Sequence, residues 1–150
     1  MNPIRIFISS VQKELAEERS VLRNYLLGDA LLSRFFDVFL FEDVPATDRH
    51  ADTCYLDEVQ RCDLYLGIFA NEYGIESTNG LSPTHREFRK ATELCKTRLI
   101  YVKGIDDSKR NPKMNALISE AGTELIRRRF NSAEELIAAV YASLVKLLEE

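Results

Sequence analysis

Residues 63–74 read DLYLGIFANEYG, and the polar loop IESTNGL and the segment SPTHREFRKA follow them directly. Residues 64–69 are apolar almost throughout, which is typical of a central strand in a parallel sheet that is covered on both faces. The Tyr73-Gly74 pair predicts a turn after this strand. Pro83 stands near the first turn of the next expected helix, where proline is tolerated. A buried strand, a long loop and a helix therefore follow one another, and we expect any chemical centre of the protein to lie among them.

The same alternation of strand and helix patterns extends over the whole chain. Short runs rich in β-branched and aromatic residues predict strands, and apolar residues at helical spacing predict amphipathic helices. Strands are expected at residues 4–8, 35–41, 64–69, 99–102 and 125–130. Helices are expected between Ser10 and Gly28, at residues 54–61, 83–95 and 113–121, and from residue 132 to the end of the chain.

Two of these helices carry a capping-box pattern. Ser9 with Gln12 fits the Ser-x-x-Gln form before the first helix, and Ser132 with Glu135 fits it before the last. In the first helix the charged side chains are expected on the faces away from the core. These are Lys13, Glu14, Glu17, Glu18 and Arg19.

Five strands that alternate with five helices predict an α/β domain of three layers, with a parallel sheet between two layers of helices. The flavodoxin-like strand order 2-1-3-4-5 is expected for such a chain. Residues 1–150 are expected to form a single domain. The last helix runs to Glu150 without a stop signal, which favours the N-terminal module of a longer polypeptide.

Composition excludes several classes of protein. The net charge of −4 does not supply the basic stripe that nucleic-acid surfaces need, so direct nucleic-acid binding is not expected. No apolar run reaches the length of a membrane helix, and no signal-peptide pattern is present. Three widely spaced cysteines, Cys54, Cys62 and Cys95, predict neither a disulfide framework nor a zinc site. A reducing, cytoplasmic setting without a membrane partner is the expectation.

Several motifs of known chemistry are missing from the sequence. There is no phosphate-binding G-x-x-x-x-G-K-[ST], no dinucleotide G-x-G-x-x-G, no G-x-S-x-G and no Cys-x-x-Cys. His50 and His85 have no matched partners in the pattern, so neither a catalytic triad nor a metal site is expected. The sequence therefore predicts no resident cofactor and no metal.

In a sheet of this order, ligands bind beyond the carboxyl ends of the strands, at the crevice between the first and third strands. The candidate ligand-binding residues at this edge are Ser9, Ser10, Asp43, Tyr73, Gly74 and Ser82. Four of them also have a plainer interpretation. Ser9 and Ser10 can be helix caps, Tyr73 can pack over the sheet, and Asp43 can be a turn residue beside Glu42.

Glu87 is the candidate catalytic residue. At about 100° per residue, the apolar stripe of its helix contains Phe88, Ala91, Leu94 and Cys95, and Glu87 falls on the edge of that stripe. It lies in the first turn and is expected to face the crevice, where the helix N-terminus stabilises a carboxylate. The alternative is a half-exposed first-turn glutamate with no role beyond that stabilisation.

Several segments carry a family resemblance. FISSVQKELAEER at 7–19, FEDVPA at 41–46, and the pattern Ser82-x-Thr84-x-x-Glu87-Phe88-x-x-Ala91 resemble the domain of unknown function 4062 family. That family is similar in fold to TIR domains and nucleoside 2-deoxyribosyltransferases. The resemblance implies that Glu87 stands at the place of their catalytic glutamate. It departs from the TIR pattern at Thr84-His85, where TIR domains have a tryptophan-cysteine pair.

The resemblance implies two functions. The first is a TIR-like interaction and signalling module of a larger regulator, which contacts other domains of the same chain and senses a nucleotide, with a homo-oligomer as an open possibility. Its partner domains would be NTPases, helical repeats or AlbA/Schlafen-like DNA-binding and helicase-related segments. The alternative is an enzyme that uses Glu87 to cleave or transfer at an N-glycosidic bond of a nucleotide. A third hypothesis is an adaptor to a DNA-handling ATPase, with residues 127–129 near nucleic acid.

Overall fold

A five-stranded sheet forms the middle layer of the protein, and neighbouring strands in the order β2-β1-β3-β4-β5 are all parallel. The computed structural model describes residues 2–150. The strand order and the layered α/β class confirm the predictions made from the sequence. The strands are β1 (Ile4–Ser9), β2 (Phe36–Phe39), β3 (Leu64–Phe69), β4 (Thr97–Lys103) and β5 (Arg127–Phe130).

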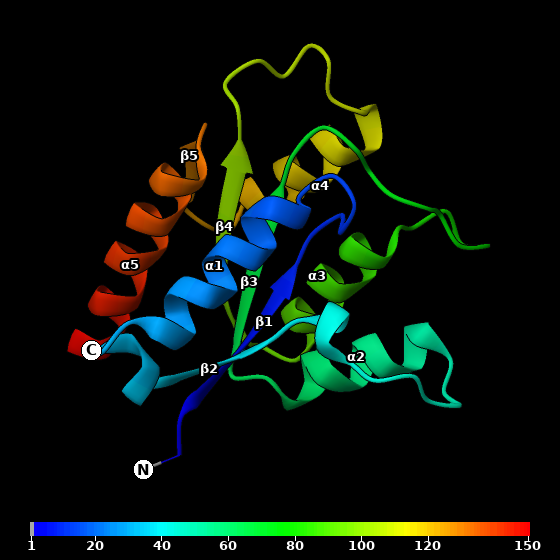
Figure 1. Ribbon diagram of the computed structural model, residues 1–150. Helices are drawn as coiled ribbons and strands as arrows, with labels where there is room; N and C mark the ends of the chain where they lie inside the picture. The colour runs from blue at the N-terminus through cyan, green and yellow to red at the C-terminus, as the bar shows by residue number, and fades with distance from the viewer. Residues whose placement is uncertain (1) are drawn as a thin grey trace.

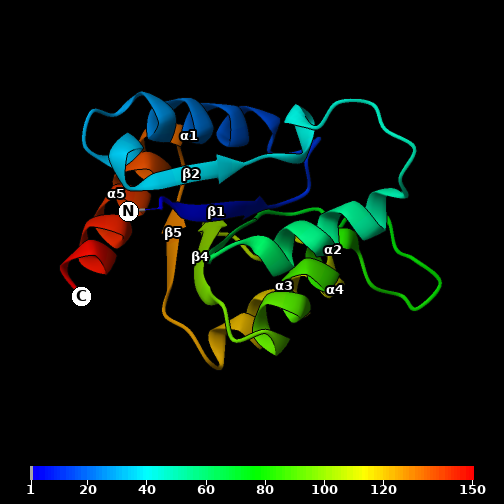
Figure 2. The ribbon, with the colours of Figure 1, turned by 90° about the horizontal axis from the view of Figure 1, so that it is seen from below.

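Helices cover both faces of the sheet (Figures 1 and 2). One face carries α1 (Ala16–Gly28) and α5 (Ala133–Glu149). The opposite face carries α2 (Ala51–Arg61), α3 (Pro83–Glu93) and α4 (Pro112–Gly122). Two short 3-10 helices, η1 (Leu32–Arg34) and η2 (Phe41–Asp43), flank β2.

Each helical layer encloses its own apolar core against the sheet. On the α1 and α5 side, Leu22, Leu26 and Val140 pack against the sheet face that carries Ile6 and Ile8. All six residues of β3 are buried, as its unbroken apolar pattern predicts for a central strand. The opposite core contains Phe7, Val59, Tyr65, Phe69, Phe88, Met114 and Leu117, among others.

Gly67 in the middle of β3 allows a close aromatic approach. A Cβ atom at this position would come within 3.0 Å of the Tyr65 ring and within 3.1 Å of the Phe69 ring. Such contacts are tighter than most Cβ atoms make, so the neighbouring side chains would have to shift if a larger residue replaced the glycine. Gly67 is also the register partner of Ser9 in β1. The Tyr65 ring therefore crosses β3 next to the point where β1 ends.

The start of the first helix differs from the expectation. Ser9 is the last residue of β1, residues 12–15 form turns, and α1 begins at Ala16. The predicted Ser9–Gln12 capping box is wrong, because the Ser9 hydroxyl donates to Glu87 and the Gln12 amide donates to Tyr55. Ser132, in contrast, accepts a hydrogen bond from the Glu135 N–H and caps α5 as predicted.

Other boundaries move by a few residues for local reasons. β2 ends at Phe39 because the chain turns into η2, and α2 begins at Ala51 because His50 caps it. The exposed positions predicted for Glu18 and Arg19 are wrong, since both side chains are buried and ion-paired, with Lys103 and Glu42 respectively. Within residues 2–150, no helix has the length and apolar character to cross a membrane.

Candidate functional site

The Ser9–Glu87 hydrogen bond joins the end of β1 to the first turns of α3. Ser82 caps α3 by accepting the His85 N–H at 3.2 Å, and Pro83 follows it at the start of the helix. One turn later Glu87 points toward the sheet. Ser9 Oγ donates to Glu87 Oε1 at 2.6 Å. The Glu87 side chain lies deeper than the half-exposed stripe edge expected from spacing, because only 4% of the residue is exposed.

Burial controls the protonation of Glu87. It raises the pKa of this carboxyl from 4.5 to about 7, although the Ser9 hydrogen bond and the charges of Arg19 and Arg86 act in the opposite direction. The nearby Asp52 charge adds to the increase. Near neutral pH the carboxyl therefore populates both protonation states, which is a property of groups that exchange protons during catalysis.

Arg19 organises the wall of the site. Its guanidinium is almost completely buried and makes a bidentate pair with Glu42, with both N–O distances at 2.7 Å. The remaining amino group donates to Ser10 Oγ at 2.8 Å and to the Ile8 carbonyl at 3.2 Å. This fork holds α1, the end of β1 and η2 together, and it places a fixed positive charge beside the Glu87 carboxyl.

A narrow recess of about 20 Å³ reaches Glu87, close to the volume needed for one water molecule. A hydrogen bond of 2.9 Å from Gln12 Nε2 to Tyr55 Oη closes it on one side. The Phe41 ring packs against Tyr55 with centroids 4.0 Å apart. The full lining is Phe7, Ile8, Ser10, Gln12, Arg19, Phe41, Tyr55, Pro83 and Glu87.

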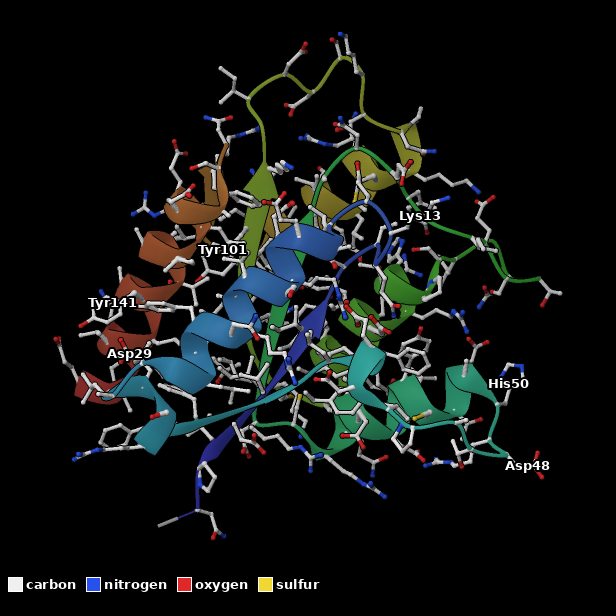
Figure 3. All side chains as sticks on the ribbon, in the orientation of Figure 1. Lys13, Asp29, Asp48, His50, Tyr101 and Tyr141 are labelled. Atoms are coloured by element: carbon white, nitrogen blue, oxygen red, sulfur yellow. The ribbon has the colours of Figure 1, made fainter. Side chains whose placement is uncertain are left out.

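An open groove of about 320 Å³ adjoins the recess at the carboxyl edge of the sheet. Its volume is at the lower end of those of small-molecule sites. Its mainly apolar lining includes Val11, Gly74 and Ile75, the last of which is 86% exposed. Figure 3 shows Lys13, another lining residue, at this edge. The groove and the recess share Ser10, Gln12, Tyr55 and Pro83, so Tyr55 and Gln12 separate the groove from Glu87.

The predicted site residues divide into two groups. Ser9, Ser10 and Glu87 lie together, Gly74 lines the groove with a φ of +93°, and Ser82 is a buried cap. Asp43 lies elsewhere. It pairs with Arg23 at 2.9 Å and lines a separate groove of about 390 Å³ beside β2, which does not reach Glu87.

Tyr73 and His85 form a second buried pair. Tyr73 Oη lies 2.7 Å from His85 Nδ1, and His85 Nε2 lies 3.3 Å from the Glu120 carboxylate, which also pairs with Arg89. The expectation that His85 lacks partners is therefore wrong. Burial lowers the pKa of His85, so the neutral ring donates to Glu120 and accepts from Tyr73. This chain fixes the loop after β3 to α3 and α4.

The structure gives His50 a capping role, and it also bears on the prediction of no metal site. The His50 ring accepts the Asp52 N–H at 3.2 Å and caps α2. Among residues 2–150, no group of three histidine, cysteine or acidic side chains is placed to hold a metal ion.

Sequence reasoning missed Arg19, Gln12 and Tyr55. Arg19 is the arginine of the Glu-Glu-Arg segment that carries the family resemblance, and that segment was the signal that could have identified it. Tyr55 and Gln12 meet only in the folded chain, 43 positions apart.

A family model described as a domain of unknown function (DUF4062) matches residues 5–145. The chain belongs to the DUF4062 family. No curated protein matches the sequence of this DUF4062 domain.

The solved structures that share the fold of the DUF4062 domain include the following three. The CMP N-glycosidase BcmB of Clostridium botulinum is 13% identical, with a TM-score of 0.57 over 93% of this chain and 98% of that one. A conserved protein from Enterococcus faecalis V583 is 13% identical, with a TM-score of 0.53 over 95% and 99% of the two chains. The TIR domains of the activated Roq1 resistosome are 15% identical, with a TM-score of 0.54 over 81% and 72%. The fold is therefore TIR-like and is also that of a nucleotide N-glycosidase.

Proposed function

We propose that the DUF4062 domain binds a nucleotide at the carboxyl edge of its sheet and cleaves the N-glycosidic bond, with Glu87 as the catalytic residue. The observation that carries this proposal is the buried Glu87 carboxyl, held by Ser9 at the point where the strand order reverses. The likeness in fold to a CMP N-glycosidase supports the substrate class.

The chemistry needs a carboxylate at this place. When the C1′–N bond breaks, its electron pair leaves with the base and positive charge develops on the sugar ring. A carboxylate beside C1′ stabilises that charge or bonds to the carbon. Water then adds to C1′, and a proton from the water ends on the base. Ser9 holds Oε1 of Glu87, so Oε2 is the oxygen available to the sugar.

Arg19 and Ser9 both favour the reactive, ionised form of Glu87, and burial opposes them. A pKa of about 7 leaves a large fraction of the carboxyl ionised at neutral pH. Burial also strengthens the interaction of the carboxylate with a developing positive charge, because water is excluded from the recess.

The recess must widen for this reaction. Its volume of about 20 Å³ does not accommodate a sugar ring, whereas the neighbouring groove has about 320 Å³. We propose that the nucleotide first occupies the groove and that Tyr55 then moves away from Gln12. This movement opens a path from the groove to Glu87 for the sugar carbon.

The test uses CMP, NAD and a panel of deoxynucleosides with chromatographic detection of the released base. The wild-type domain should release a base from at least one of them, and Glu87→Gln should release none. Glu18→Gln is the matched control, because Glu18 is also a buried glutamate but pairs with Lys103 away from the recess. Equal release by wild type and Glu87→Gln would refute the proposal.

The second candidate function is a TIR-like signalling module of a longer protein, and the closed recess favours it. In a signalling module of this kind, the groove senses a nucleotide without cleaving it. The partners are other domains of the same chain or a second copy. The free cysteines fit a reducing compartment such as the cytoplasm. This candidate predicts a thermal shift with a nucleotide but no released base, and a downstream domain in the full reading frame.

A further inference from the structure

Tyr65 is a buried tyrosine in β3 whose hydroxyl has no hydrogen-bond partner within residues 2–150. A buried hydroxyl without a partner destabilises a folded protein, and phenylalanine would fill the same space without that cost. The ring itself is well placed. It stacks with Phe7 at 6.4 Å and meets the edge of Phe88 at 5.9 Å between centroids. Packing therefore accounts for the ring and leaves the hydroxyl without an explanation.

The surroundings of the hydroxyl suggest a role. The Tyr65 ring crosses β3 over Gly67, and Gly67 is the register partner of Ser9. Ser9 and Glu87 both lie close enough to the Tyr65 hydroxyl to change its pKa. Burial raises that pKa well above its usual value, and the Glu87 charge adds to the increase. The hydroxyl therefore keeps its proton and can donate a hydrogen bond.

The hydroxyl of Ser9 can form hydrogen bonds with both Glu87 and Tyr65. It donates its proton to Glu87 Oε1 at 2.6 Å, which leaves its oxygen lone pairs free to accept another hydrogen bond. A hydrogen bond from the Tyr65 hydroxyl to Ser9 Oγ would complete a chain from tyrosine to serine to carboxylate. In such a chain each bond polarises the next, so the serine becomes a better donor to Glu87.

We propose that Tyr65 is a positioning residue for Glu87, which acts through a Tyr65–Ser9–Glu87 hydrogen-bond chain and keeps the Ser9 proton directed at the carboxylate. This proposal rests on the proposed function, in which the ionised Glu87 is the reactive form. Tyr65 does not touch the groove, so its contribution is to the ionisation of Glu87 and not to ligand binding.

Other groups also act on Glu87 and must be kept unchanged in a test. These are Arg19 of α1, Arg86 of α3, and Asp52 and Tyr55 of α2, while Tyr65 approaches from β3. Substitution of tyrosine by phenylalanine at position 65 removes one oxygen and alters none of these groups. Tyr101→Phe is the matched control, because Tyr101 is a buried tyrosine of β4 whose hydroxyl donates to Ser143 of α5, on the opposite face of the sheet (Figure 3).

The experiment follows the carboxyl carbon of Glu87 by carbon-13 NMR in ligand-free protein, with Glu87→Gln to assign the signal. Tyr65→Phe should move the titration midpoint upward by about half a pH unit or more, the effect of one weakened hydrogen bond. Tyr101→Phe should leave it unchanged. In a Ser9→Ala background, Tyr65→Phe should add no further shift, because the intermediate link is gone. A Tyr65→Phe shift no larger than that of Tyr101→Phe would overturn the proposal.

A second measurement covers the case in which Tyr65→Phe does not fold. A carbon-13 label placed only at the Tyr65 ring in the wild-type protein should report the Glu87 titration with the same midpoint, and an invariant signal would overturn the chain. These readouts need no turnover. If the midpoints shift but no base is released from any nucleotide, the chain stands and the proposed function fails.

Discussion

Ser9 and Glu87, 78 positions apart in the sequence, share a buried hydrogen bond of 2.6 Å at the carboxyl edge of the sheet. One residue ends β1 and the other lies in the second turn of α3. Parallel strand order brings these elements together at the crevice where such folds bind ligands.

Glu87→Gln should stabilise the protein at alkaline pH. The folded-state pKa of about 7 lies above the ordinary value of 4.5, so the native state binds more protons than the unfolded state between these values. Stability therefore falls as pH rises from 4.5 to 7, by about 3 kcal/mol. Glutamine is neutral at every pH and avoids this loss. Urea unfolding at about pH 5 and about pH 8 measures the difference. A parallel pH dependence in wild type and variant would contradict the raised pKa.

Ser9→Ala should weaken the ionised form of Glu87. Loss of the hydroxyl removes its hydrogen bond to the carboxylate, so the pKa of Glu87 should rise and the pH profile of base release should move to higher pH. The rate at neutral pH should fall about tenfold, the effect of one hydrogen bond to a charged group. Ser143→Ala, which removes the acceptor of Tyr101 on the other face, is the control. An unshifted profile in Ser9→Ala would argue against a role for this bond.

Gln12→Ala should open the recess. The variant removes the 2.9 Å hydrogen bond to Tyr55 and leaves the tyrosine itself in place. If the closed form limits access to Glu87, a larger open population should lower KM by up to about tenfold and change kcat less. Steady-state kinetics with the best nucleotide of the panel gives both constants. An unchanged KM would show that this bond does not restrict entry.

Arg19→Met should destabilise the domain. The variant keeps much of the side-chain length but removes four hydrogen bonds, to Glu42, Ser10 and the Ile8 carbonyl. Since Glu42 is partly exposed and water can solvate it, we expect a loss of about 2 kcal/mol, less than for a fully buried pair. Adding Glu42→Gln should recover part of it. Urea unfolding of the single and double variants checks this, and full additivity would contradict a coupled pair.

Much of the fold could be predicted because alternating strands and helices allow few arrangements. The apolar run in β3 and the Ser132 cap are local features, and both were predicted correctly. The start of α1 was not predicted correctly. Ser9 fits a capping pattern in the sequence, but register with Gly67 keeps it in β1 and turns its hydroxyl to Glu87.

The candidate site was only partly predictable. Helical spacing identified Glu87, but its burial depends on Phe41 and Tyr55, which come from other parts of the chain. Arg19 was assigned to a solvent-facing side because charged residues usually lie there. Its partner Glu42 belongs to a segment expected to form only a turn, and no local pattern connects the two.

Base release from CMP and NAD at about pH 8, where Glu87 is mostly ionised, is the decisive measurement for catalysis by Glu87. Wild type, Gln12→Ala, Glu18→Gln and Glu87→Gln are compared under the same conditions. A catalytic Glu87 requires a released base with the first three proteins and none with Glu87→Gln. Release that persists in Glu87→Gln, or no release from any substrate even in Gln12→Ala, would contradict the assignment of Glu87 as the catalytic residue of an N-glycosidase.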